Sequence, residues 1–313
     1  MNALSLRQVS KRFGQVTAVD SLSLQVERGW MYGLLGPNGA GKTTAIRMIL
    51  NIIQPDQGQI SLLDSSEWSL TDRVGYLPEE RGLYRQMKVF DLLLFLAAVK
   101  GMAKRQARAE IHRWLEKLEL CAWEQKKVEE LSKGMQQQIQ FIASVLHGPD
   151  LIIFDEPFTG LDPLNTNRLK DIILSLNKQG STIILSTHRM EQVEKLCDHI
   201  CLIDRGRKVL DGPLSAIKSE YGRNTVRLEF DGPTTFLNNS PLIDKMNLYG
   251  HYAELRLRPS TDPQELLRVA VQKIRIHKFE IVEPSLDDIF MEKVGTEKTR
   301  DDASDQKSEF ATD

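Results

Sequence analysis

The residues from Gly36 to Thr44 have the types and spacing that bind the phosphate groups of a nucleotide. Their order fits the pattern G-x-x-x-x-G-K-[ST], in which glycines let the backbone curl tightly with its N–H groups pointing inward. The Lys42 side chain can then reach the β- and γ-phosphates, and the Thr43 hydroxyl can ligate Mg²⁺. The phosphate-binding loop that we expect consists of Gly36, Pro37, Asn38, Gly39, Ala40, Gly41, Lys42, Thr43 and Thr44.

Two carboxylates follow a strongly apolar segment further along the chain. Residues 151–154 are continuously apolar, as in a parallel strand buried on both faces, and Asp155 and Glu156 come next. We expect Asp155 to hold Mg²⁺, directly or through water, and Glu156 to accept a proton from an attacking water. Two acids that merely face solvent are the alternative, and a phosphate-binding loop in the same chain argues against it.

Two further residues could contact a nucleotide, although each could also have a purely structural role. His188 ends the next apolar strand, where its ring could hydrogen-bond the γ-phosphate or the attacking water. A surface histidine at a strand end is the alternative. Phe13 precedes a turn between two strands, where it could stack on a nucleobase or belong to the core. The residues themselves leave both possibilities open.

The segments around these residues predict an α/β fold. Residues 30–35 are mostly apolar and predict a strand before the loop, and residues 44–53 carry isoleucines at helical spacing after it. The positive end of such a helix faces the phosphates, which argues against a chance glycine-rich turn. A strand, a helix and a strand at residues 151–154, 164–176 and 183–185 predict a doubly wound core.

Other segments predict elements around this core and a smaller domain after it. Residues 22–26 alternate between apolar and polar, as an antiparallel strand does, and residues 89–120 have a helical pattern throughout. Ser132 is a suitable N-cap for a further helix. Beyond residue 222 the pattern is that of a small α+β domain. The organisation that we expect is a nucleotide-binding domain at 1–222, an accessory domain at 223–295 and a disordered tail at 296–313.

Composition indicates a folded chain and excludes several classes of protein. The 313 residues are 41% hydrophobic and 27% charged, and the net charge of −2 gives no electrostatic reason to expect nucleic-acid binding. The cysteines have no metal-type spacing, so we expect reduced cytosolic thiols, although Cys197 and Cys201 could share a helix face. The N-terminal residues lack the apolar core of a signal peptide, and the apolar run at 92–99 is too short to span a bilayer.

The motifs resemble, in kind and in order, those of the nucleotide-binding subunit of an ABC transporter, over roughly residues 3–220. Residues 36–44 resemble its Walker A loop, and residues 151–156 resemble its Walker B strand with the catalytic glutamate. The resemblance implies an α/β P-loop NTPase with a mixed-sheet core, an antiparallel β subdomain and a helical subdomain at about 86–148. Phe13 lies where this family places the aromatic ring that stacks on adenine, so the resemblance favours that role.

Shorter motifs complete the resemblance. The segment Leu-Ser-Lys-Gly-Met at 131–135 resembles the ABC signature, and its Ser132 and Gly134 would contact phosphate. Residues 159–162, which end in Asp162, resemble the D-loop, and His188 resembles the switch histidine.

Three positions depart from the family pattern. Lys133 and Met135 stand where the usual signature has a glycine and a glutamine. Glu79 lies where the family has its Q-loop glutamine. A glutamate can still ligate water or Mg²⁺, but its charge repels the γ-phosphate.

Two segments favour export over import. Residues 76–84 resemble the exporter subgroup that includes sodium and antibiotic efflux ATPases, and residues 284–290 resemble the end of its C-terminal extension. The resemblance implies an ABC-2-type exporter ATPase that hydrolyses ATP to ADP and phosphate with Mg²⁺. It also implies an integral membrane permease and a second ATP-binding subunit as partners, at the cytoplasmic face of the cell membrane.

The alternative is a soluble ABC-type ATPase that acts on ribosomes or in DNA repair, or that serves as a nucleotide-gated interaction module on a non-membrane partner. Soluble members of the translation type usually carry two ATPase units, whereas this sequence has one Walker A and one signature, and no basic stripe for RNA. A P-loop GTPase would need the guanine-reading Asn-Lys-x-Asp motif, which the sequence lacks. We expect no nucleic-acid partner.

Overall fold

The computed structural model describes residues 1–64, 72–80, 82–221, 225–233, 235–238, 240–250, 252–258 and 261–293. The chain divides between Gly212 and Pro213 into two compact units. The expected boundary at residue 222 and the tail at 296–313 lie outside the described residues and stay predictions.

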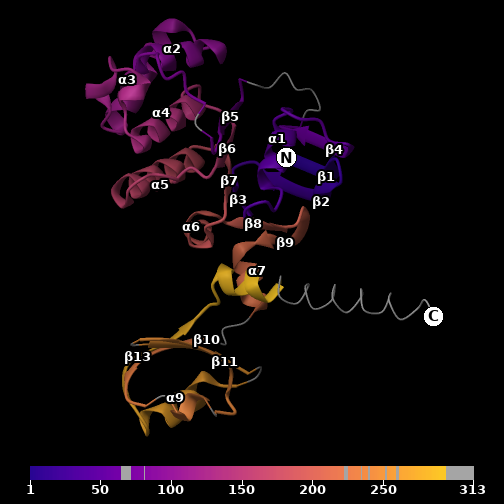
Figure 1. Cartoon of the computed structure of the whole chain (residues 1–313), viewed down its shortest axis with the longest axis vertical. Coiled ribbons are helices and arrows are strands. Elements are labelled where there is room, and N and C mark those ends of the chain that lie inside the picture. The colour runs from indigo at the N-terminus through magenta and orange to yellow at the C-terminus, as the bar shows by residue number, and fades with distance from the viewer. Residues whose placement is uncertain are drawn as a thin grey trace, which may run out of the picture. The chain divides into compact units, whose positions relative to one another are not determined.

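A six-stranded sheet forms the centre of the first unit (Figure 1). In spatial order its strands are β5 (Val74–Leu77), β6 (Leu151–Asp155), β7 (Thr182–Thr187), β3 (Met31–Leu35), β8 (His199–Asp204) and β9 (Arg207–Pro213). The first five run parallel. Every residue of β3, β6 and β7 is buried, which is why each strand contains a run of consecutive apolar residues, such as 151–154 in β6 and 183–185 in β7. The expected α/β fold is confirmed.

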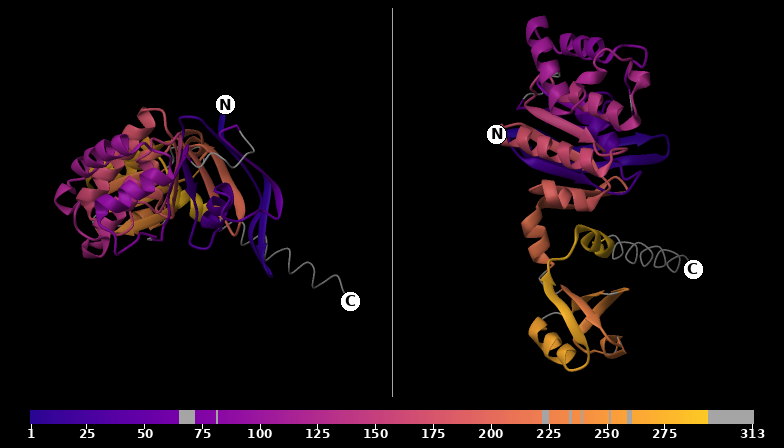
Figure 2. Two further views of the ribbon diagram at one scale, coloured as in Figure 1. Left: turned by 90° about the horizontal axis from the view of Figure 1, so that it is seen from above. Right: turned by 90° about the vertical axis from the view of Figure 1, so that its left-hand side faces the viewer.

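Different elements cover the two faces of this sheet, as Figures 1 and 2 show. One face carries α1 (Lys42–Ile49) and an antiparallel sheet of β2 (Val16–Glu27), β1 (Asn2–Phe13) and β4 (Gln57–Leu62). The other carries α4 (Lys133–Val145), α5 (Pro163–Lys178) and α6 (Met190–Leu196). Side chains of β6 alternate accordingly: Ile153 packs in one cluster with Ile46 of α1, and the Phe154 ring stacks 5.2 Å from that of Phe141 in α4.

Two segments differ from expectation. Residues 89–120 form two helices, α2 (Val89–Val99) and α3 (Lys104–Lys117), because the chain turns at Gly101, where φ is +77°. Cys197 and Cys201 do not share a helix face: Cys197 follows α6, and Cys201 lies in β8. Two 3-10 helices, η1 (Cys121–Trp123) and η2 (Val128–Glu130), lead from α3 to α4.

The second unit has a core of its own. After α7 (Leu214–Glu220) comes an antiparallel sheet in the order β11 (Ile243–Tyr249), β12 (Tyr252–Leu257), β10 (Thr225–Asp231) and β13 (Arg275–Val282). Helices α8 (Thr235–Asn238) and α9 (Pro263–Val271) accompany this sheet, and residues 286–293 are also helical. Leu266 and Ala270 of α9 pack with Val226, Leu228 and Leu255 of the sheet. The expected α+β character is confirmed, and β11 is a strand that the sequence pattern did not predict.

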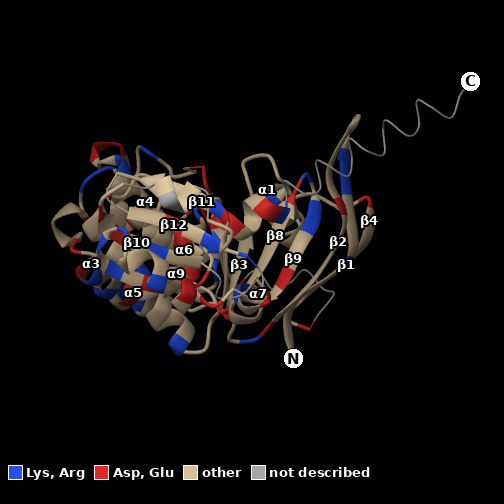
Figure 3. Ribbon diagram, turned by 90° about the horizontal axis from the view of Figure 1, so that it is seen from below, with Lys and Arg blue, Asp and Glu red and all other residues tan. Residues whose placement is uncertain are grey.

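Acidic and basic residues are interspersed along the elements of both units (Figure 3). The apolar run at 92–99 lies in α2, a helix of 11 residues. Among the described helices, none combines the length and the apolar character that crossing a bilayer requires.

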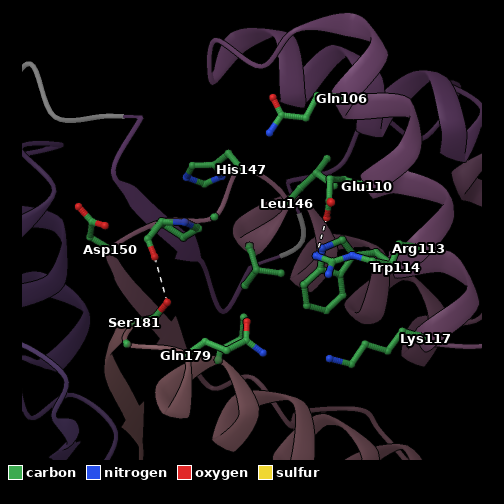
Figure 4. Close-up of a pocket in the computed structure, with 15 residues that line it drawn as sticks. Gln106, Glu110, Arg113, Trp114, Lys117, Leu146, His147, Asp150, Gln179 and Ser181 are labelled. Atoms are coloured by element: carbon green, nitrogen blue, oxygen red, sulfur yellow. Dashed lines mark hydrogen bonds and ion pairs between the residues drawn. The ribbon is translucent and has the colours of Figure 1, made fainter.

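A cavity of about 470 Å³ opens at the amino ends of β6 and β7 (Figure 4). Residues of α3, the end of α5 and the loop before β6 line it, and Glu110 pairs with Arg113 at its wall. The phosphate-binding loop follows the carboxyl end of β3, so this cavity lies at the opposite edge of the parallel sheet from that loop.

His147 lines this cavity as a neutral ring. Its Nε2 donates a hydrogen bond to the carbonyl oxygen of Val74 at 3.2 Å, and its Nδ1 is buried with no partner within the described ranges. Burial, assisted by the positive charge of Lys100, lowers the pKa of His147 to about 4, against smaller opposing effects of the hydrogen bond to Val74 and of the charge of Asp72.

We predict that His147 makes the protein less stable in mild acid. An unfolded histidine has a pKa near 6.5, so the unfolded chain takes up the proton more readily than the folded chain. The stability that the neutral ring contributes is therefore complete above pH 6.5 and declines as the pH falls toward 4. Chemical denaturation at pH 7 and pH 5 should show a smaller loss of unfolding free energy for His147→Gln than for the wild type. Equal losses would contradict the assignment.

Candidate functional site

The phosphate-binding loop joins β3 to α1, and two of its positions accommodate only glycine. Gly36 has a φ of +151° and Gly41 a φ of +103°. A Cβ atom at Gly36 would lie 2.1 Å from the carbonyl oxygen of Ile203, and one at Gly41 would lie 2.3 Å from that of Ala18. Backbone atoms cannot move aside as a side chain can, so the loop is held in this curled form by its neighbours.

The Lys42 ammonium group folds back over the loop. Its Nζ donates hydrogen bonds to the carbonyl oxygens of Gly36 at 2.7 Å and Pro37 at 3.0 Å. Burial lowers the pKa of Lys42, and the negative charges of Glu156 and Asp155 oppose that shift. The group is therefore a largely desolvated cation whose present partners are neutral carbonyls, and phosphate oxygens would be stronger ones.

Thr43 and Asp155 lie together at the carboxyl end of the sheet. The Thr43 Oγ1 donates a hydrogen bond to the Asp155 Oδ2 at 3.1 Å, and Asp155 is 1% exposed. Burial is the main cause that raises the pKa of Asp155. A hydroxyl and a carboxylate oxygen are ligands of the kind that Mg²⁺ prefers, so these residues fit the metal expected from the sequence.

Glu156 and His188 are in direct contact. The Glu156 Oε1 accepts a hydrogen bond from the His188 backbone N–H at 2.9 Å and lies 2.6 Å from the ring Nδ1. The Oε2 accepts a hydrogen bond from the Thr187 hydroxyl at 3.0 Å. Glu156 itself has a φ of +51°, a backbone conformation that is uncommon outside glycine. The end of β7 thus holds the carboxylate of Glu156 in one orientation.

Two residues near this edge were missed by sequence reasoning. Thr187 orients Glu156, and a polar residue ending a buried strand was the signal available for it. Tyr76 ends up near Asp155, and burial chiefly raises its pKa to about 12. A tyrosine in a short strand gives no comparable signal.

Glu79, which the sequence predicted near the nucleotide, follows β5 and is exposed. Its negative charge is among those that raise the pKa of Lys42 against the effect of burial.

The signature and D-loop residues act as helix caps in this chain. Ser132 is the N-cap of α4, and its Oγ accepts a hydrogen bond from the Met135 backbone N–H at 3.2 Å. Asp162 is the N-cap of α5, and its side chain accepts one from the Asn165 backbone N–H at 2.9 Å. Gly134 lies against the D-loop, since a Cβ there would be 3.2 Å from the carbonyl oxygen of Gly160.

Phe13 ends β1 as an exposed ring. Its side chain is 52% exposed, and the Lys11 ammonium lies 5.7 Å from the ring centre. An aromatic ring in the core would be covered, so the core alternative for Phe13 does not hold. Its stacking on adenine remains a prediction.

We predict that Gly36→Ala destabilises the protein. The new methyl group meets a backbone oxygen, so the loop must distort at a cost of about 1–3 kcal/mol or more. Thermal unfolding should show a clearly lower midpoint than for the wild type. Gly250→Ala is the matched control, because a Cβ there meets nothing within 4 Å. Equal midpoints for Gly36→Ala and Gly250→Ala would contradict the loop geometry.

Two family models match the chain. The model described as "ABC transporter" matches residues 19–159, and that described as "ATP-binding protein DrrA1-3-like, C-terminal domain" matches residues 212–294. The second match begins where the structure divides into its two units.

Curated relatives match most of the chain. An uncharacterized ABC transporter ATP-binding protein, YhaQ of Bacillus subtilis, is 46% identical over 293 residues, which are 93% of this chain and 98% of the relative. The Nod factor export ATP-binding protein I of Burkholderia lata is 37% identical, with 80% of this chain and 83% of the relative covered.

Solved structures show the same fold. One described as the ATP binding subunit of an ABC transporter has a TM-score of 0.66 and 28% identity, with 70% of this chain and 93% of that chain covered. The structure of cbiO1 from Clostridium perfringens, part of the ABC transporter complex cbiONQ, has a TM-score of 0.62 at 22% identity and covers 70% of this chain and 92% of its own. The chain therefore belongs to the ATP-binding proteins of ABC transporters, in the ABC-2-type exporter subgroup that its sequence resembles.

Proposed function

We propose that this chain hydrolyses ATP to energise export through an integral membrane permease. The observation that carries the proposal is the gathering of Lys42, the Thr43–Asp155 pair and Glu156 at one edge of the sheet. Residues 1–222 would form the ATP-binding domain, residues 223–295 an accessory domain and residues 296–313 a disordered tail. The protein would act at the cytoplasmic face of the cell membrane.

The residues of the site suggest a role for each step of hydrolysis. Lys42 would exchange its two carbonyl partners for oxygens of the β- and γ-phosphates. Thr43 and Asp155 would hold Mg²⁺, which when bound neutralises charge on those phosphates. Glu156 would orient the attacking water and take its proton on a carboxylate oxygen that the end of β7 already holds in place. Phe13 would stack on the adenine ring.

A second ATP-binding subunit would complete the site. Within one chain the phosphate-binding loop leads into α1, whereas the signature begins α4. Two chains packed head to tail would bring the N-terminus of α4 in one, with Ser132 and Gly134, to the nucleotide held by the other. ATP would favour the closed pair because it contacts both chains, and loss of the γ-phosphate would remove some of these contacts.

We predict that Glu156→Gln binds ATP but hydrolyses it about 100-fold more slowly or worse, because the amide cannot accept the proton. The variant should then accumulate as an ATP-bound dimer, measurable by light scattering during gel filtration. Lys42→Ala is the contrasting variant, since it should lose affinity for ATP in a nucleotide titration. Phosphate release at the wild-type rate from Glu156→Gln would remove this residue from the role of base.

A surface next to the Glu79 loop suits a membrane partner. Tyr84 and Phe95 are 57% and 45% exposed, and their rings meet edge to face with centres 5.9 Å apart. A hollow of about 320 Å³ runs beside them along α2, lined chiefly by apolar residues such as Leu94 and Ala98. Exposed aromatic residues beside an apolar hollow are typical of sites where a partner helix docks. Contact there would pass closure of the ATPase to the permease.

We predict that Phe95→Glu weakens capture of the permease from detergent-solubilised membranes by about fivefold or more, because it places a charge in an apolar contact. ATP affinity should stay unchanged. Ile52→Glu, which adds the same charge at an exposed apolar residue after α1, is the matched control. Capture of ribosomes or other soluble partners alone, with no membrane protein, would instead support the soluble ATPase.

A further inference from the structure

Buried glutamines connect the signature helix to three separate segments of the nucleotide site. The Gln137 Nε2 donates a hydrogen bond to the carbonyl oxygen of Pro157, directly after Glu156, at 3.3 Å. The Gln138 Nε2 donates one to the Asn165 side chain at 2.9 Å, and Asn165 in turn bonds Asp162. Helix α4 is therefore hydrogen-bonded directly to the loop after the Walker B strand and, through Asn165 of α5, to Asp162 of the D-loop.

Gln140 makes the third connection, and it brackets Glu79. Its Nε2 donates hydrogen bonds to the carbonyl oxygens of Glu80 at 3.0 Å and Pro78 at 3.4 Å. These two carbonyls flank Glu79, whose charge acts on Lys42. Gln140 touches neither Lys42 nor the phosphate-binding loop through these bonds, so any effect on the site would pass through the backbone at Glu79.

The burial of the Gln140 side chain lowers the stability of the fold. Gln140 is 5% exposed, and its Oε1 is buried with no partner in the part of the chain that the structure describes. A buried amide oxygen without a hydrogen bond is destabilising, and an apolar side chain of the same length would avoid that penalty. The hydrogen bonds that the Gln140 Nε2 donates to the two backbone carbonyls therefore explain the presence of a glutamine at this position.

We propose that Gln140 is a positioning residue that ties the signature helix to the loop of Glu79. Ser132 caps α4, and Gln140 follows eight residues later, about 12 Å along the helix axis. A shift of α4 against the nucleotide of the second subunit would move the carbonyls on either side of Glu79. The contact would thus couple one site of the dimer to the charge of Glu79, which acts on Lys42 of the other site. This inference rests on the proposed function, since it needs ATP at the α4 terminus.

A double-mutant cycle with purified full-length chain tests the proposal. Gln140→Met keeps the length and removes the donor, and it should lower kcat about fivefold or more with a smaller change in KM for ATP. In a Glu79→Ala background the same substitution should change kcat by less than about twofold, because the residue through which it acts is gone. If Gln140→Met lowers kcat by the same factor in the wild-type and Glu79→Ala backgrounds, the two residues act independently and the proposal is overturned. An unchanged kcat in Gln140→Met would also overturn it.

The control separates positioning from structural support. The Asn177 Nδ2 also bridges two backbone carbonyls, those of Gly29 at 2.8 Å and Ser181 at 3.1 Å, but at the opposite edge of the sheet. Asn177→Leu should therefore lower the melting temperature without changing kcat in either background. If Asn177→Leu lowers kcat by as much as Gln140→Met does, loss of any such bridging amide lowers kcat, and Gln140 has only a structural role.

A second variant, Gln140→Asn, keeps the amide but shortens the side chain by one methylene. The same double-mutant cycle with Glu79→Ala is measured for it, so the coupling can still be tested if Gln140→Met does not fold. A wild-type chain with no ATP hydrolysis would overturn the proposed function itself. If the wild type hydrolyses ATP but the Gln140 and Glu79 substitutions lower kcat by independent factors, only the proposed coupling is overturned.

Discussion

The site depends on one electrostatic constraint, the placement of a desolvated lysine at the centre of a tight glycine loop. Burial lowers the pKa of Lys42, so its charged form must be supported by nearby groups. The carbonyls of Gly36 and Pro37 supply part of that support, and the carboxylates beyond them supply the rest. A polyanion entering the loop meets a cation with few competing water molecules, where its charge interacts most strongly.

The parallel sheet brings the carboxylates to that lysine. β3, β7 and β6 are neighbours, with Leu35 opposite Thr187 and Asp155 opposite Ser186. All three strands therefore end at one edge, and the residues that follow them meet there although they are far apart in sequence. A shift of one strand by a residue would turn Asp155 away from Thr43, so the buried apolar pairs along the strands also fix the chemistry.

Much of this arrangement could be predicted from the sequence, for identifiable reasons. The loop at 36–44 and the strand at 151–155 have strong local signals, because glycine positions and continuous apolar runs leave few alternatives. The division of 89–120 at Gly101 was missed because apolar residues recur at helical spacing on both sides of the turn, in α2 and in α3. The contact of Thr187 with Glu156 depends on strand adjacency, which the periodicity of a single chain does not encode.

Helix α4 shows why such contacts are hard to read from a pattern. A helix packed against a sheet usually buries aliphatic residues, yet α4 also buries Gln137, Gln138 and Gln140. The glutamines look like a polar stretch in sequence, and only the fold turns them toward three different segments, which are two loops and the start of α5. Each buried amide restricts its partner segment to one distance and direction, which an apolar contact would not do. On the coupling that we propose, such a helix would move these segments together, so that a nucleotide bound at one surface would alter the chemistry at another.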